Sequence, residues 1–182
     1  RNKGLVGNIY KGRVCRVLPG MEAAFVEVGM DRAGFLHVSD IAPYDALNKP
    51  PIASLLSEGQ DVLVQVIKDP MGTKGGRLTA NITIPSRYLV FMPKSDNVGV
   101  SARIEDEAER ERLRDMLLMH KEQLGDAGYI IRTAAETATP ESMVQDVLFL
   151  NKLWRSISEQ ASAVEAGNVI HEDLSLPVRV LR

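Results

Sequence analysis

Two residues able to form charged hydrogen bonds stand at the end of a short apolar run. In the stretch "GYIIRTAAE", residues 128–136, the apolar run ends abruptly in Arg132 and Thr133. The pattern predicts a fixed cation and a hydroxyl at the mouth of a buried strand. On residue type alone, the default interpretation is a surface arginine at a strand end.

A second set of residues has the chemistry to bind nucleic-acid bases. Side chains two positions apart on a strand share one face, so Phe35 and His37 project together, and Phe25 on the adjacent strand can lie beside them. An exposed aromatic on such a face contributes roughly 1 to 3 kcal/mol per stacked base. By residue type alone, a phenylalanine in "AAFVEV" is more often a core residue, and a lone histidine is more often structural. The candidate phosphate contacts around these rings are Lys11, Arg13 and Lys74.

The first half of the chain predicts the strands that would carry these aromatics. Short β-rich runs broken by glycine and proline span residues 5–18, 22–29, 33–41, 61–70 and 77–85. Five strands with no long helix between them indicate a small antiparallel barrel over residues 1–84. Residues 42–59, which are polar and contain prolines, predict the loop that leads to the fourth strand.

The second half predicts a small α/β domain over residues 85–182, with elements in the order strand, helix, strand, helix. Residues 86–93 and 128–134 predict the strands, and residues 105–125 the first helix, ended by Gly125. Thr139 and Pro140 are suited to cap and begin the second helix. From Met143 to Val164 its apolar residues step by three and four, which predicts a buried stripe with Trp154 as a packing anchor. The fold class is therefore α+β.

Composition excludes several classes of protein. The chain has 182 residues, a formal net charge of -2 and a single cysteine, so any phosphate-binding surface must be a local patch and no internal disulfide can form. Cys15 lies in an alternating strand, which favours a packed thiol over a nucleophile. No apolar run approaches the roughly 20 residues of a membrane span, so we expect a cytoplasmic protein.

The chain resembles a known family through motifs that run along most of its length. The stretch "GRVCRVLPGMEAAFVEVGMDRAGFLHVSDI", residues 12–41, resembles an S1 domain, which is an RNA-binding module with the OB fold. Together with "VIKDPMGTKGGRLT", "PSRYLVFMP", "VGVSARIE" and "GYIIRTAAE", it resembles the ribonuclease E/G family, and within it the ribonuclease G branch. The resemblance implies an OB-fold S1 barrel followed by a 5′-sensor domain, which runs into the start of an RNase H-like segment at the C-terminus.

The resemblance implies roles for individual residues. Arg132 and Thr133 match the arginine and threonine that bind the 5′-monophosphate of an RNA, Val90 matches a residue that contributes backbone contacts, and Ser86 stands at a fourth such position. Phe25, Phe35 and His37 match the nucleic-acid face of the S1 domain. The implied partner is single-stranded RNA with a 5′-monophosphate end.

The resemblance also implies what these residues lack. The family's magnesium-binding aspartates and the cysteine pair of its zinc-linked dimer come later than Arg182, so we expect these residues to bind RNA without cutting it and to hold no metal. The intact enzyme is expected to be a magnesium-dependent endoribonuclease of rRNA and mRNA, and a homodimer or tetramer. Two alternatives are a stand-alone RNA-binding regulator and an OB fold used for protein docking.

Overall fold

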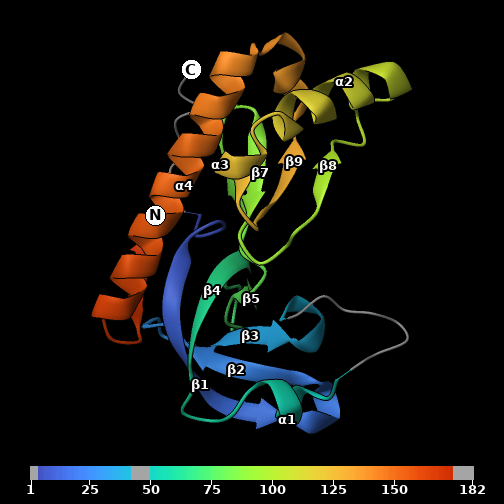
Figure 1. The fold of residues 1–182 in the computed structure, drawn as a ribbon. Coiled ribbons are helices and arrows are strands. Elements are labelled where there is room, and N and C mark those ends of the chain that lie inside the picture. The colour runs from blue at the N-terminus through green and yellow to red at the C-terminus, as the bar shows by residue number, and fades with distance from the viewer. Residues whose placement is uncertain (1–3, 42–49, 174–182) are drawn as a thin grey trace. The chain divides into compact units, whose positions relative to one another are not determined.

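The computed structural model describes residues 4–41 and 50–173, which form two compact units (Figure 1). Of the described residues, the first unit holds 4–82 and 157–173, and the second holds 83–156. The sequence pattern predicts a second domain that includes everything from residue 85 onward. Residues 157–173 lie in the first unit instead, because the strand Asn168–His171 pairs with the strand Ile9–Leu18.

The first unit is a closed five-stranded barrel, as predicted. Neighbouring strands run in the order β1-β2-β3-β5-β4, and pairing of β1 with β4 closes the circle. One pairing differs from an all-antiparallel barrel, because β3 and β5 run parallel. The strands are β1 (Ile9–Leu18), β2 (Ala23–Glu27), β3 (Gly34–His37), β4 (Asp61–Lys68) and β5 (Arg77–Thr79).

Alternation along the strands builds the core of the barrel. Successive side chains point to opposite faces of a strand, so every second residue of β2, of β3 and of β1 as far as Val14 turns inward. The inward side chains are fully buried, and Phe25 and Phe35 fall on the alternate, partly exposed positions. Representative core residues are Val14, Val26, Leu36, Val64 and Leu78.

A β-bulge changes the position expected for Cys15. The register between β1 and β2 shifts between Val14 and Arg16, and Cys15 is the extra residue. Its thiol is exposed and contacts the carbonyl oxygen of Phe25 at 3.4 Å. The expectation of a packed thiol is therefore wrong, because a bulge interrupts the alternation on which it depends.

The structure adds short elements that the sequence analysis does not predict. Strand β10 (Asn168–His171) extends the barrel sheet by pairing antiparallel with the start of β1. In the predicted loop at 42–59, residues 42–49 lie outside the described residues, and Ile52–Leu55 form the single turn α1. The first unit also contains the 3₁₀ helices η1 (Pro19–Met21) and η2 (Val38–Asp40).

The second unit is a four-stranded sheet with helices. The sheet order is β6-β7-β9-β8, in which β8 and β9 are parallel and the other pairs antiparallel. Strand β8 has no counterpart in the sequence prediction, because its three residues are too few to show a period. The strands are β6 (Ile84–Pro85), β7 (Leu89–Met92), β8 (Val98–Val100) and β9 (Gly128–Ile131).

The first predicted helix is divided in two. Helix α2 (Glu107–Leu118) ends before His120, whose ψ of 38° leaves the helical region, and α3 (Lys121–Leu124) follows it. Gly125 ends α3 as predicted, and its positive φ of 64° is one that glycine adopts readily. A pair between Glu109 and Arg112 at 2.7 Å supports the interpretation of the charged run as a solvated helix face.

The long second helix agrees closely with its prediction. Helix α4 (Pro140–Ala163) begins at the predicted proline, and the Thr139 hydroxyl oxygen accepts the N–H of Ser142 at 3.0 Å. Met143, Val147, Leu150 and Ile157 of the stripe are buried. Trp154 packs edge-on against Phe91 with ring centroids 6.2 Å apart, which confirms its packing role. None of the helices within the described ranges has the length and apolar character that a membrane crossing requires.

Candidate nucleic-acid interface

The barrel presents two aromatic rings on one face. Phe25 of β2 and Phe35 of β3 lie directly opposite each other in the antiparallel register. Their ring centroids are 6.1 Å apart in an edge-to-face arrangement, and both side chains are partly exposed. The pair therefore offers fixed apolar faces to solvent, which is the arrangement that stacks on bases.

Arginines flank the aromatic pair on both neighbouring strands. Arg77 of β5 lies opposite Phe35, with its guanidinium carbon 5.9 Å from the ring centroid. The exposed Arg16 of β1 lies opposite Phe25. Sequence reasoning missed both, because the bulge in β1 and the parallel β3–β5 pairing set these registers and neither feature is visible in the strand pattern.

The His37 ring makes hydrogen bonds within its own turn. It caps η2, and its Nδ1 accepts the N–H of Ser39 at 3.1 Å and contacts the Ser39 hydroxyl at 2.8 Å. The ring is partly exposed at the end of β3, two residues from Phe35. His37 thus lies on the predicted face, but its placement also has a structural cause.

Lys74 lies in a tight turn next to the aromatic strand. Met71 and Lys74 exchange both backbone hydrogen bonds, at 3.0 and 2.9 Å, and the lysine is exposed. The loop then passes close to β3: a Cβ on Gly75 would lie 2.0 Å from the carbonyl oxygen of Ala33. The glycine therefore permits the close approach that brings this cationic turn beside Phe35.

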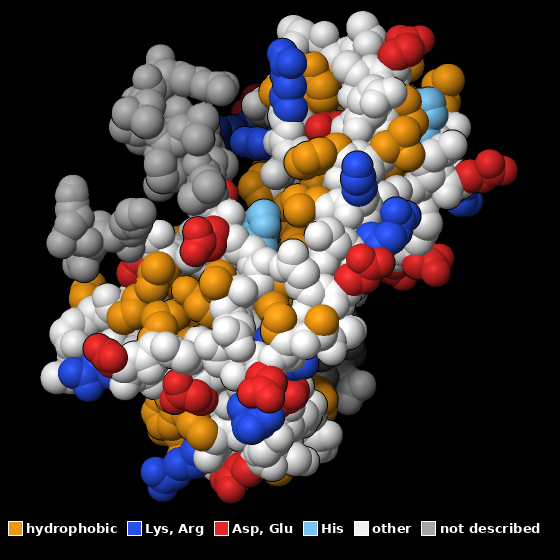
Figure 2. Space-filling view, turned by 90° about the vertical axis from the view of Figure 1, so that its left-hand side faces the viewer, with side chains coloured by type: hydrophobic (Ala, Val, Ile, Leu, Met, Phe, Trp, Pro, Cys, Tyr) orange, Lys and Arg blue, Asp and Glu red, His pale blue; other side chains and the backbone are white. Residues whose placement is uncertain are grey.

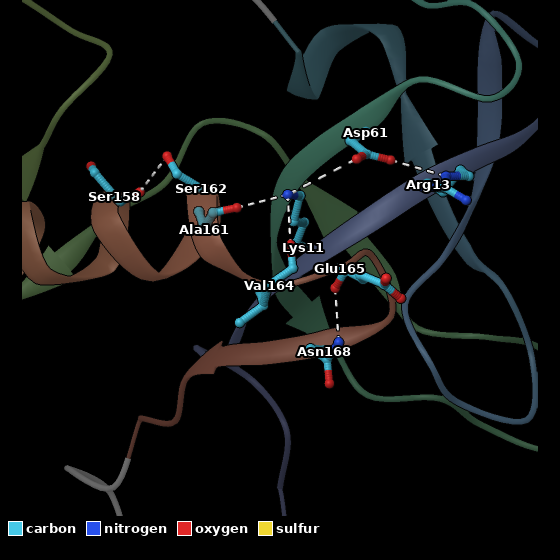
Figure 3. A network of polar contacts seen from close by, with 9 residues as sticks. All are labelled: Lys11, Arg13, Asp61, Ser158, Ala161, Ser162, Val164, Glu165 and Asn168. Carbon is cyan, nitrogen blue, oxygen red and sulfur yellow. Dashed lines mark hydrogen bonds and ion pairs between the residues drawn. The ribbon is translucent and has the colours of Figure 1, made fainter.

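Lys11 and Arg13 lie in the first half of β1 and take part in a polar network (Figure 3). The Lys11 ammonium donates to the carbonyls of Ala161 and Val164 at 2.7 and 2.8 Å, at the C-terminal end of α4. Its side chain is only 18% exposed. Arg13, which is 56% exposed, donates to Asp61 at 3.0 Å. The structure therefore does not bring Lys11 together with the aromatic pair.

The second unit contains the predicted Arg132 at the end of β9. Its backbone N–H donates to the carbonyl of Tyr88 at 2.8 Å, which continues the β7–β9 pairing by one residue. Its Nη1 donates to the carbonyl oxygen of Ser86. This hydrogen bond fixes one N–H group of the guanidinium. No other hydrogen bond from the guanidinium occurs within residues 4–41 and 50–173. Because a guanidinium has five N–H donors, the remaining ones can bind an anion.

Ser86 and its neighbours are held by an aspartate from α4. The Ser86 hydroxyl lies 2.6 Å from the carboxylate of Asp146, and the same carboxylate oxygen accepts the N–H of Tyr88 at 2.8 Å. A hydroxyl has one proton to donate, and the carboxylate is its charged acceptor. Sequence reasoning missed Asp146, which belongs to no motif and reaches Ser86 only through the packing of α4.

The remaining two predicted residues lie nearby in the same sheet region. Thr133 is exposed and is the first residue of the 3₁₀ helix η3 (Thr133–Thr137), directly after Arg132. Val90 lies in β7 between Pro85 of β6 and Ile130 of β9. Its backbone is thus within the sheet rather than at a free edge, and its partly exposed side chain lies on the same face as that of Ile130.

The charges and acidic groups restrict the chemistry of these residues. On the face turned toward the viewer in Figure 2, basic and acidic side chains are interspersed, with no continuous field of one sign. In the part of the chain that the structure describes, no three acidic, histidine or cysteine side chains gather as metal ligands would.

Comparisons with known proteins give a match for each of the two units. The model of the S1 RNA binding domain matches residues 5–76, and that of the ribonuclease E/G family matches residues 83–182. The chain is 49% identical to ribonuclease G of Salmonella typhimurium (strain SL1344) and 48% identical to ribonuclease G of Escherichia coli (strain K12), in both cases over 99% of this chain. It is 43% identical to ribonuclease E of Nostoc sp. (strain PCC 7120 / SAG 25.82 / UTEX 2576), over 97% of this chain and 26% of that protein.

The chain spans 38% of the length of these ribonuclease G relatives. The family model covers more than half of the chain, and the S1 match accounts for the barrel that carries the aromatic pair. This chain therefore belongs to the ribonuclease E/G family.

Proposed function

We propose that these residues are the RNA-recognition part of a single-strand-specific endoribonuclease that acts in the processing and decay of rRNA and mRNA. The observation that carries the proposal is the partly exposed pair of Phe25 and Phe35 on a barrel that matches an S1 RNA binding domain. Single-stranded RNA stacks its bases on this pair, and Lys74 in the adjacent turn contributes a phosphate contact.

The second unit recognises the 5′ end of the RNA. Arg132, anchored on the Ser86 carbonyl, directs its other N–H groups to a 5′-monophosphate, and the Thr133 hydroxyl adds a donor. A 5′-hydroxyl offers no anion to this pair. The loss of one charged hydrogen-bond partner weakens binding by roughly 1.5 to 3 kcal/mol, or about ten- to a hundredfold.

The other predicted residues receive narrower roles. Ser86 acts by positioning Arg132 through its carbonyl, because its hydroxyl is engaged with Asp146. Val90, in β7, contacts the terminal nucleotide. Lys11 stabilises the end of α4 rather than a phosphate, because two carbonyls already surround its ammonium group.

Cleavage belongs to the intact enzyme. We assign the magnesium-dependent cut, the zinc link between protomers and the dimer or tetramer to regions that the relatives possess beyond the 38% of their length that this chain matches. The expected location is the cytoplasm. A stand-alone RNA-binding regulator is the less favoured function, because the relatives that match 99% of this chain are named ribonuclease G.

Binding to short single-stranded RNA tests both halves of the proposal. Fluorescence polarisation would compare a 5′-monophosphate RNA with the same RNA carrying a 5′-hydroxyl, at two salt concentrations, for the parent chain, Arg132→Ala and Phe25→Ala. Arg103→Ala is the control, because it removes an exposed arginine from the same unit, whereas Arg132 is partly exposed. Salt dependence separates phosphate contacts from base stacking.

The expected result is tighter binding of the monophosphate RNA, with the difference removed by Arg132→Ala and kept by Arg103→Ala. If the two RNAs bind equally and Phe25→Ala abolishes binding, the barrel face alone carries recognition and the 5′-end assignment is wrong. If neither RNA binds, the proposed RNA-recognition function of these residues is wrong.

A further inference from the structure

Four side chains form one row across the outer face of the barrel. Arg16 lies opposite Phe25, Phe25 opposite Phe35, and Phe35 opposite Arg77, on the four adjacent strands β1, β2, β3 and β5. Neighbouring strands are about 4.8 Å apart, so the row is about 14 Å long and runs perpendicular to the strands. It has a cation at each end and two aromatic rings between them.

Arg77 is held in place more tightly than an ordinary surface arginine. Its Nη2 donates to the carboxylate of Asp40 at 3.0 Å, and its guanidinium carbon lies 5.9 Å from the centroid of Phe35. That distance is within the range of a cation–π contact. Its side chain is nevertheless 43% exposed, so its unused N–H groups face solvent.

The position of Asp40 is itself fixed. The carbonyl oxygen of Asp40 accepts the N–H of Ala80 at 2.7 Å and the hydroxyl of Thr79 at 3.2 Å, which ties η2 to the end of β5. The same strand begins with Arg77. The carboxylate and the guanidinium are therefore held on two segments bonded to each other, and the orientation of Arg77 over Phe35 follows from the fold of the barrel.

We propose that Arg77, oriented by Asp40, is a third stacking and phosphate-binding member of the barrel face, and that Arg16 binds a phosphate at the opposite end. This inference rests on the proposed RNA-binding function and deepens it. Single-stranded RNA crosses β1, β2, β3 and β5 along the row, with bases on the two rings and backbone phosphates near the two arginines.

The chemistry of arginine favours it at this place. A guanidinium plane both stacks on an aromatic ring and donates in a fixed fork to phosphate, whereas a lysine ammonium is a strongly hydrated point charge. Nucleic-acid bases stack on arginine planes as they do on aromatic rings. Arg77 can thus extend the row of stacking groups beyond Phe25 and Phe35 by one position while adding positive charge.

The test measures binding of a 5′-hydroxyl single-stranded RNA, which isolates the barrel face from recognition of the 5′ end. The variants are Arg77→Ala, Arg77→Lys, Asp40→Ala and Arg16→Ala, with Arg103→Ala as the exposed-arginine control and Phe35→Ala as the test of the face itself. Each is measured over a range of salt concentrations, and unfolding curves verify that each variant is folded.

We expect Arg77→Ala to weaken binding about tenfold and to reduce the slope of log affinity against log salt by about 0.7, the value for one lost phosphate contact on a single strand. Arg77→Lys is expected to keep the slope but not the affinity. Arg16→Ala is expected to reduce the slope by a similar amount, and Arg103→Ala to change neither quantity.

Asp40→Ala separates orientation from simple charge. Removing a negative charge beside RNA would tighten binding if only the net charge mattered, whereas loss of the partner that orients Arg77 weakens it. Tighter binding by Asp40→Ala, or unchanged binding by Arg77→Ala while Phe35→Ala loses affinity, overturns this inference alone. If Phe35→Ala keeps the parental affinity for RNA, or if the parent chain does not bind RNA, both the proposed function and this inference are overturned.

Discussion

The hydroxyl of Ser86 donates to the carboxylate of Asp146 over 2.6 Å, so a residue of α4 fixes the turn that carries the carbonyl partner of Arg132. The same carboxylate oxygen accepts the N–H of Tyr88. Asp146 therefore acts on the arginine indirectly, through the backbone of residues 86–88. Its importance can be measured without touching Arg132.

Asp146→Ala is expected to destabilise the protein by about 1 to 3 kcal/mol, because the Tyr88 N–H and the Ser86 hydroxyl lose a charged partner. It should also reduce the preference for 5′-monophosphate over 5′-hydroxyl RNA. Denaturant unfolding and fluorescence polarisation measure the two effects, and Asp146→Asn, which keeps one acceptor oxygen, should recover part of both. Glu141→Ala, on an exposed position of the same helix, is the control. An unchanged end preference in folded Asp146→Ala would contradict the positioning role.

Lys11 tests the difference between a structural and an RNA-binding lysine. Its ammonium group caps two carbonyls at the end of α4, where a cation is favourable. Lys11→Met keeps the apolar stem and should lower the free energy of unfolding by about 1 to 2 kcal/mol, while leaving the salt slope of RNA binding unchanged. Arg13→Met, at a more exposed site, should cost less stability. A smaller salt slope with unaltered stability would instead return Lys11 to the set of phosphate contacts.

The two rings of the barrel face should be separable by substitution. Phe25→Ala and Phe35→Ala are each expected to weaken RNA binding by roughly 1 to 3 kcal/mol, the cost of one lost stacking surface. Phe35→Ala should be the more damaging, because it also removes the ring beneath Arg77. Titrations at high salt, where phosphate contacts are weakened, show the loss most clearly. Retention of parental affinity by the folded Phe25→Ala, Phe35→Ala double variant would exclude stacking on this face.

The residue pattern predicted the structural features that depend on local periodicity. It missed the features that depend on the register between paired strands. The alternation around Phe25 and Phe35, the Thr139 cap and the buried stripe from Met143 are local signals, and the structure confirms them. The extra residue at Cys15 is not local in this sense, because a bulge is a property of two paired strands. The break at His120 likewise leaves the apolar spacing of the helix intact.

The same distinction between local and tertiary signals applies to the residues of the candidate sites. Arg132 and Thr133 were found through a motif in contiguous residues, whereas Asp146 and Arg77 reach their partners only after α4 packs and β5 pairs in parallel with β3. Lys11 shows the converse error of sequence reasoning. A lysine in an RNA-binding barrel invites a phosphate role, but the tertiary contact with α4 involves residues about 150 positions away.

A close backbone contact in the first unit gives a stability prediction with an internal control. Gly29 has φ 90°, and a Cβ there would lie 2.2 Å from the carbonyl oxygen of Gly167, just before β10. Gly29→Ala should destabilise the protein by more than about 1 kcal/mol, because the added Cβ strains both the positive-φ backbone and the contact with Gly167. Gly20→Ala, which meets nothing within 4 Å, should have little effect. Equal stability of the two variants in urea would contradict the close packing of residue 167 on the turn at Gly29.

His171 predicts how the stability of the first unit depends on pH. Burial lowers the pKa of His171 below its usual 6.5, with the nearby Asp173 and Glu172 opposing that shift, and the residue lies opposite Ile9 in the β1–β10 pairing. The unfolded chain therefore binds the proton more readily than the folded one. The contribution of neutral His171 is fully present above about pH 6.5 and is lost as the pH falls below that value, so acidification should weaken the folded state.

Urea unfolding at pH 7.5 and pH 5.5 checks this sign. The parent chain is expected to lose stability on acidification, and His171→Gln, which cannot titrate, should lose less over the same interval. His37→Gln leaves His171 in place and should retain the part of the pH dependence that His171 causes. A parent and a His171→Gln variant with the same pH dependence would show that the proton on His171 does not distinguish the folded from the unfolded chain, and that β10 pairs with β1 equally well in either protonation state.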